Sequence, residues 1–234
     1  MNKTFKALLT MLAIMLGSQA LANPCPPGNP PTNCAPPPGN VILDLNGTSV
    51  PHTYRQYTTT FIATMTTTNL SFAFREDPAF LFLDDIVLTT GGGPNLVTNG
   101  GFEGGVDGAG EPLGWVYLNS FGAAAGGVVG GGARTGSFAY VDGAVQAYDG
   151  ITQAIIGTLV GQVYTLSFWL NDNGGLTTFS RLSTNGNITG TGGNGIDLLV
   201  YAGAIPTLVP EPESLALLGV GVLALALARR RKSR

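Results

Sequence analysis

Few residues in this sequence could carry acid–base or nucleophilic chemistry. The one histidine, His52, lies in Val50-Pro51-His52-Thr53, with no cysteine or nucleophile motif beside it. An isolated histidine is more often a surface or turn residue than a catalytic base. A phosphate-binding Gly-x-x-x-x-Gly-Lys loop is absent, and no pair of carboxylates stands out as the acid and base of a glycoside hydrolase. This inventory favours a protein that is not an enzyme.

The charge of the central part of the chain narrows the choice of partner. Between residues 23 and 208 the sequence has four arginines, no lysine and twelve acidic residues. The net charge of this part is −8, against −3 for the whole chain. Such a surface repels nucleic-acid phosphates, so we expect no binding to nucleic acid. It suits calcium, or a neutral partner such as a sugar.

Residues 1–22 have the three parts of a secretory signal peptide. Lys3 and Lys6 precede an apolar stretch, and Ala20-Leu21-Ala22 is a small-x-small cleavage site. The chain is therefore expected to be exported. In an oxidising compartment, Cys25 and Cys34 of the proline-rich leader, residues 23–40, are expected to form a disulfide. The leader itself is expected to be an extended spacer.

The C-terminal segment, residues 209–234, combines a short apolar run with a basic end. The run 215–228 has 14 apolar or glycine residues, fewer than the ~20 that a helix needs to span a membrane. The basic residues at 229–232 can snorkel and hold that end in the cytoplasm. A buried core helix is the alternative, but four consecutive cations rarely close such a helix. We therefore expect a short transmembrane helix that stops export.

The order of parts in this segment resembles a known sorting signal. Val209-Pro210-Glu211-Pro212, an apolar run and a basic end with Arg229, Arg230 and Arg231 are similar to the PEP-CTERM signal of Gram-negative bacteria. The resemblance implies recognition by an exosortase, a membrane transpeptidase that cuts near the motif. It also implies transient residence in the inner membrane, a final place at the cell surface or in the extracellular matrix, and association with exopolysaccharide and biofilm.

The body of the chain, residues 41–208, has the pattern of an all-β domain. Short runs rich in Thr, Val, Phe and Tyr are separated by Gly, Asn and Asp, and segments with a helical period are missing. The runs that indicate strands are 60–65, 69–75, 80–88, 163–170 and 196–201. We expect their inward aromatic residues to form the core of a β-sandwich.

Parts of the body resemble jelly-roll domains of the galactose-binding-like type. The opening segments of that family match 95–103 with Gly114-Trp115, then 136–140 and 151–168, whereas its closing strands match earlier residues, within 41–90. This order implies either one circularly permuted sandwich, with residues 94–205 supplying the opening strands, or two incomplete sandwiches in tandem. One domain is favoured, because about 50 residues would bury too little surface to stand alone.

The same resemblance implies a structural calcium ion that joins the first strand to the last. Its matching ligands are Glu103 and Asp85, with backbone carbonyls completing the shell. The alternative is that these carboxylates cap turns or bind loop amides. A sugar site would need an exposed aromatic platform beside amide and carboxylate groups. Its candidates are Trp115, Tyr117, Tyr148, Asn171 and Asp172. A tryptophan placed like Trp115 is more often buried than exposed.

Together these features predict an exported, non-enzymatic, jelly-roll β-sandwich that an exosortase sorts to the cell envelope and that binds extracellular polysaccharide. The alternatives are a structural matrix protein without a ligand and a secreted glycoside hydrolase. Fold resemblance does not choose among them, because the same sandwich carries unrelated functions.

Overall fold

Runs of alternating polar and apolar residues form the strands of this protein. The structure, a computed structural model, describes residues 39–77, 79–118, 126–145, 148–173, 181–182, 188–189 and 195–203, all within one unit of the chain. The predicted signal peptide, the leader up to residue 38 with Cys25 and Cys34, and the C-terminal segment 209–234 lie outside the described residues. In the part of the chain that is described, no helix is long and apolar enough to cross a membrane.

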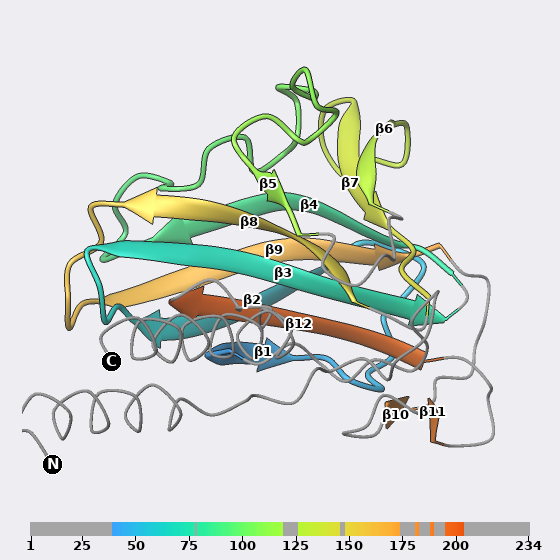
Figure 1. Cartoon of the computed structure of the whole chain (residues 1–234), viewed down its shortest axis with the longest axis horizontal. Helices are drawn as coiled ribbons and strands as arrows, with labels where there is room; N and C mark the ends of the chain where they lie inside the picture. The colour runs from blue at the N-terminus through green and yellow to red at the C-terminus, as the bar shows by residue number, and fades with distance from the viewer. Residues whose placement is uncertain are drawn as a thin grey trace, which may run out of the picture. The chain divides into compact units, whose positions relative to one another are not determined.

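Ten of the strands form two five-stranded antiparallel sheets (Figure 1). The first sheet contains, in spatial order, β1 (Val41–Asp44), β12 (Gly195–Gly203), β3 (Thr67–Asp77), β8 (Asp149–Ile156) and β5 (Val116–Tyr117). The second contains β2 (Arg55–Ile62), β9 (Val163–Asp172), β4 (Leu81–Thr89), β7 (Phe138–Asp142) and β6 (Gly127–Gly130). A separate pair joins β10 (Arg181–Leu182) to β11 (Ile188–Thr189). The prediction of an all-β sandwich is confirmed.

The strands of residues 41–90 are interleaved with the later strands. In the first sheet β12 lies between β1 and β3, and in the second sheet β9 lies between β2 and β4. Two tandem sandwiches would require residues 41–90 to form a separate sheet. The described strands do not form such a sheet. Early and late strands therefore close one sandwich together, while the circular permutation stays a prediction.

Inward aromatic side chains join the two sheets. Phe72 of β3 meets Phe168 of β9 edge to face, with ring centroids 5.2 Å apart. Phe74 of β3 and Tyr140 of β7 pack with tilted rings whose centroids lie 5.6 Å apart. All four are fully buried, and burial of each such side chain contributes about 2 kcal/mol. The expected aromatic core is confirmed.

The segment 95–102 runs beside β4 and is not itself a strand of either sheet. The Asn95 side chain accepts the N–H of Leu88 at 2.9 Å and donates to the carbonyl oxygen of Ile86 at 3.2 Å. Gly100 is needed at the closest approach, because an added Cβ would lie 2.2 Å from the carbonyl oxygen of Ile86. The segment that resembles the opening of a jelly roll thus lies against the strand that resembles its close.

Candidate functional site

Asp84 and Asp85 lie at an irregularity of β4 that sets the direction of both carboxylates. The register of β4 against β9 shifts between Asp84 and Val87, and Asp85 has a φ of 49°. Neighbouring side chains of a regular strand point to opposite faces, whereas a bulge re-aims one of them. A left-handed φ costs an ordinary residue about 1 kcal/mol, so the contacts of these carboxylates must offset that cost.

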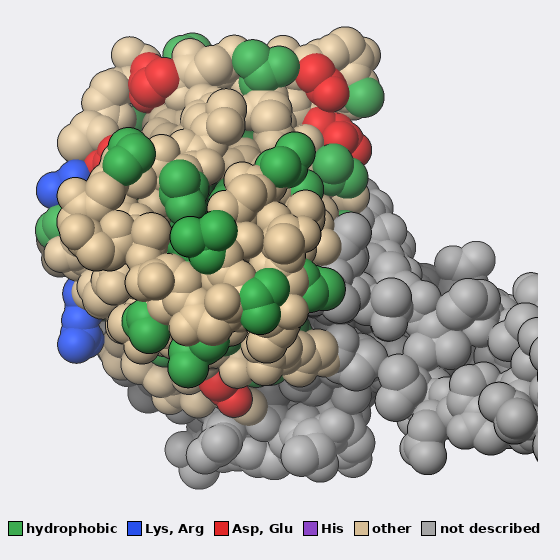
Figure 2. All heavy atoms as spheres, turned by 90° about the vertical axis from the view of Figure 1, so that its left-hand side faces the viewer, with side chains coloured by type: hydrophobic (Ala, Val, Ile, Leu, Met, Phe, Trp, Pro, Cys, Tyr) green, Lys and Arg blue, Asp and Glu red, His purple; other side chains and the backbone are tan. Residues whose placement is uncertain are grey.

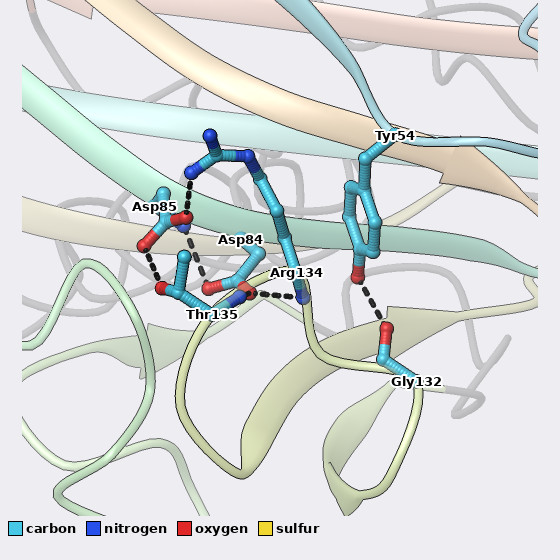
Figure 3. Close-up of polar contacts among 6 residues, drawn as sticks. All are labelled: Tyr54, Asp84, Asp85, Gly132, Arg134 and Thr135. Carbon is cyan, nitrogen blue, oxygen red and sulfur yellow. Dashed lines mark hydrogen bonds and ion pairs between the residues drawn. The ribbon is translucent and has the colours of Figure 1, made fainter.

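Both carboxylates bind the turn that contains Arg134 and Thr135 (Figure 3). Asp84 Oδ2 accepts the backbone N–H groups of Arg134 at 2.7 Å and Thr135 at 3.2 Å. Asp85 accepts the Thr135 hydroxyl at 2.7 Å and forms an ion pair with Arg134 Nη1 at 2.6 Å. Burial raises the pKa of Asp84, although the backbone hydrogen bonds partly offset this rise. Four bonds from two adjacent residues therefore fix the turn.

Aromatic side chains fasten the same turn to the second sheet. The Arg134 guanidinium lies over the Trp169 ring of β9, 3.6 Å from its centroid. The Tyr54 hydroxyl donates to the carbonyl oxygen of Gly132 at 2.7 Å (Figure 3). Burial, followed by the charges of the two aspartates, raises the pKa of Tyr54, so its phenol stays neutral. The guanidinium thus sits between an aromatic face and a carboxylate.

Glu103 binds the end of this turn. Its Oε1 accepts the backbone N–H groups of Ser137 at 2.8 Å and Phe138 at 2.9 Å. Glu103 and Asp85, the two predicted calcium ligands, therefore reach the same short loop from different segments. The two segments lie side by side, as the hydrogen bond from the Ile86 N–H to the carbonyl oxygen of Gly100 shows.

In the structure, protein groups already engage the carboxylates that were predicted to bind calcium. A calcium ion takes six to eight oxygen ligands, whereas Asp85 already binds a guanidinium and a hydroxyl, and Glu103 binds two amides. Nowhere in the described residues do three or more His, Cys, Asp or Glu side chains form a group that could hold a metal ion. The structural calcium ion therefore stays a prediction. In the structure Arg134 supplies the positive charge beside Asp85, and the carboxylates bind a turn.

The residues predicted for a sugar site do not share one surface. Trp115 and Tyr148 are 3% and 1% exposed, so neither ring offers a platform. Trp115 instead packs against Phe72 and Phe102 in the core, with centroids 6.1 Å from each. The prediction is wrong for both rings, because aromatic burial in the core outweighs the polar contact that each can make at its edge.

The other three candidates lie in polar contacts near the ends of strands. Tyr117 is half-buried, and its hydroxyl donates to the carboxylate of Asp149. Burial, and then this hydrogen bond, raises the pKa of Tyr117. Asn171 donates to the carbonyl oxygen of His52 at 2.9 Å, and His52 Nδ1 lies 2.8 Å from the carbonyl oxygen of the buried Asp172. His52 is therefore a turn residue, as expected.

Four buried carboxylates gather at one end of the sandwich, and sequence reasoning singled out only one of them, Asp172, as a candidate for another site. They are Glu76 of β3, Asp142 of β7, Asp149 of β8 and Asp172 of β9. Each lies two residues from a buried core side chain of its own strand, on the same inward face. The pairing of Leu81 with both Asp142 and Asp172, and of Phe74 with Asp149, places them at one end. We call these four residues the acidic end.

Tyrosines satisfy part of the acidic end. The Tyr140 hydroxyl donates to Asp142 at 3.0 Å, and the Ala144 N–H donates to its other oxygen at 3.0 Å. Burial, followed by the neighbouring Asp149, raises the pKa of Asp142 well above its usual range. The sequence signal was an aspartate two positions after an inward residue, as in Tyr140-Val141-Asp142.

Comparison with known families bears on the C-terminal segment. Residues 208–232 match the PEP-CTERM protein-sorting motif. No curated protein and no solved structure matches the chain significantly, so the likeness to galactose-binding-like domains remains a resemblance. The matched motif marks an exported protein that an exosortase processes and sorts to the cell envelope or the extracellular space.

Proposed function

We propose that the chain is a non-enzymatic component of the cell surface or extracellular matrix. Its signal peptide starts export, its C-terminal segment rests transiently in the inner membrane of a Gram-negative cell, and an exosortase then processes that segment. The observation that carries this proposal is the sorting motif at residues 208–232 joined to an acidic β-sandwich.

The engagement of the carboxylates supports a non-enzymatic role. Asp84, Asp85 and Glu103 bind the amides, hydroxyl and guanidinium of one turn. Asp142 binds a tyrosine hydroxyl and a backbone amide. Hydrolysis of a glycoside would need a pair of carboxyl groups that flank the bond in an accessible cleft, and these acids are used to hold loops and strand ends.

The outer face of the second sheet favours exopolysaccharide as the partner in the matrix. Exposed neutral side chains follow β2 there, namely Gln56, Thr58 and Thr60, and they pair across to Trp169, Ser167 and Thr165 of β9. Amide and hydroxyl groups can exchange hydrogen bonds with sugar hydroxyls without the large cost of desolvating a charge. A matrix protein without a sugar ligand remains the alternative.

The intact mass of the protein recovered from membrane, surface and medium fractions of its native host tests the sorting proposal. We expect a mass that lacks both terminal segments, outside the membrane fraction. Glu211→Gln should retain the C-terminal segment and stay with the membrane, whereas Glu111→Gln in the body should behave like the wild type. A wild-type mass that keeps residues 211–234, found only in membranes, would overturn the proposal.

The sugar partner has its own test. The processed protein should co-sediment with exopolysaccharide from the host, and the double substitution Gln56→Ala and Thr58→Ala should reduce the bound fraction several-fold. Equal binding of both proteins would place the contact elsewhere. No binding by the wild type would favour the ligand-free structural alternative.

A further inference from the structure

The end of the sandwich opposite the acidic end exposes apolar side chains on its turns. Ile156 is 82% exposed, Val160 65%, Leu159 64% and Ile62 59%. They lie in the connections between β2 and β3 and between β8 and β9, or at the strand ends that flank them. Soluble surfaces carry single apolar residues routinely, but several on adjacent turns indicate a contact surface.

Hydrogen bonds join these two connections into one surface. The Ala63 N–H donates to Gln162 at 3.0 Å, and the Gly161 N–H donates back to Ala63 at 2.8 Å. The Gly157 N–H donates to the carbonyl oxygen of Thr66 at 2.9 Å. The apolar tips are therefore held together by backbone bonds. We call the turns 63–66, 90–94 and 157–162 the uncharged end.

No charged side chain belongs to the sequence around these turns. Residues 58–74, 86–102 and 150–171 contain no Asp, Glu, Lys, Arg or His. Figure 2 shows this end face-on, with hydrophobic side chains scattered over its middle and acidic and basic side chains toward its margins. A surface without charge can approach a low-dielectric phase without the cost of removing ions from water.

The chain leaves the sandwich toward its sorting motif from the same end. β12 ends at Gly203, which pairs with Asn69 near the start of β3. Four residues, 204–207, then lead to the matched motif, so its first residue, 208, lies at most about 18 Å from Gly203. The apolar run that starts at Leu215 is twelve residues beyond Gly203, within about 43 Å.

We propose that the uncharged end docks on the surface of a lipid bilayer while the C-terminal segment is held in the membrane. The inference rests on the proposed transient membrane residence. The tips Ile156, Leu159, Val160 and Ile62 enter the boundary between headgroups and acyl chains, as interfacial apolar side chains do. The acidic end then points away from the bilayer, and the chain between Gly203 and the motif is held close to the membrane where an exosortase works.

Two observations favour lipid over a protein partner. Hydrophobic side chains are scattered over this end and do not form one continuous patch (Figure 2), whereas a protein interface needs a continuous packed core. The short connection to the sorting motif also keeps the uncharged end close to the bilayer. Such a tether raises the effective concentration of the two surfaces, so that even a weak contact forms. A second copy of the chain has no such tether.

Depth-dependent quenching in the full chain tests the proposal. Cys25→Ser and Cys34→Ser give a background for single-cysteine labelling, and Leu159→Cys and Val160→Cys place a fluorophore at the uncharged end. Phe80→Cys, just before β4 and beside the acidic end, is the matched control, because Phe80 is also an exposed large apolar residue at 49%. The labelled chains are reconstituted into phosphatidylcholine vesicles with and without nitroxide-labelled lipid.

We expect about two- to threefold quenching at positions 159 and 160 by shallow nitroxides, and none at position 80. If the chain floats with the vesicles but positions 159 and 160 are not quenched, docking is overturned while the membrane residence stands. If the chain does not float at all, both proposals fail. Changes in the label that depend on protein concentration and not on nitroxide would assign this end to self-association and also overturn lipid docking.

Processing in cells gives a second readout. Leu159→Asp with Val160→Asp should slow release of the processed protein several-fold, whereas Phe80→Asp should leave it unchanged. Equal release rates for the two variants would contradict a role for docking in processing.

Discussion

The two ends of the sandwich differ in where charged and apolar side chains lie. At the acidic end, strands finish with buried carboxylates on the face that holds the core. At the uncharged end, the same face finishes with Ile155 and Leu88, and the apolar residues continue out onto the exposed turns. Charge is normally outside and apolar surface inside. The acidic end buries charge, which lowers stability, and the uncharged end exposes apolar surface, which lowers solubility.

The strand β8 gives the strongest test of this difference between the two ends, because it reaches both of them. Asp149 is tolerated at its first position, whereas Ile155 occupies an equivalent inward position at the other end. Ile155→Asp should destabilise the fold by at least about 4 kcal/mol, because it removes buried apolar volume and buries a charge. Denaturant unfolding measures the loss.

The control for this substitution is its outward neighbour. Ala154 is exposed, so Ala154→Asp should change the unfolding free energy by no more than about 0.5 kcal/mol. Similar losses for the two variants would show that the uncharged end accepts acids as readily as the acidic end does.

The pH dependence of stability tests the buried charge of the acidic end. The pKa of Asp142 is raised in the folded protein by burial and by Asp149, so above about pH 4 the folded state keeps a proton that the unfolded state releases. This contribution to stability is complete below the unfolded pKa and is lost as pH rises through the folded pKa, at up to about 1.4 kcal/mol per pH unit.

Asp142→Asn should remove this part of the pH dependence. The variant should match the wild type near pH 4 and be more stable than it at pH 8, in urea unfolding series at both values. Parallel pH profiles for the two proteins would show that Asp142 titrates in the folded state as it does in the unfolded chain.

The smallest expected effect isolates one hydrogen bond of the acidic end. Tyr140→Phe removes the hydroxyl that donates to Asp142 and keeps the ring that packs on Phe74 and Phe102. The loss should be about 1–2 kcal/mol and should shrink in the Asp142→Asn background, as a double-mutant cycle would show. Strictly additive losses would mean that the two groups do not interact.

Alternation and composition were enough to predict the fold class and most of the long strands. The runs predicted at 69–75, 80–88 and 163–170 correspond to β3, β4 and β9, because a period of two over buried aromatic residues leaves little freedom. The shortest strands escaped notice: β5 has two residues, too few for a period to show.

The candidate site depended on features that a single strand does not encode. The shared direction of Asp84 and Asp85 comes from a bulge whose position is set by register against β9. The acidic end forms because four strands finish together, a property of their pairing and not of any one segment. The core partners of Trp115 could not be deduced either, because contact with Phe72 and Phe102 depends on the tertiary fold and not on a pattern within one segment.

The place of β12 between β1 and β3 has a consequence for the timing of folding. This strand is the last of the sandwich in sequence, yet it pairs on one side with β1 and on the other with β3. A chain that emerges from an export channel from its N-terminus therefore keeps two open strand edges until residue 203 is outside. Only four residues, 204–207, separate that point from the sorting motif. The last strand of the sandwich and the sorting motif therefore leave the channel almost together. By the time the motif can be processed, β12 is outside and the sandwich can be complete.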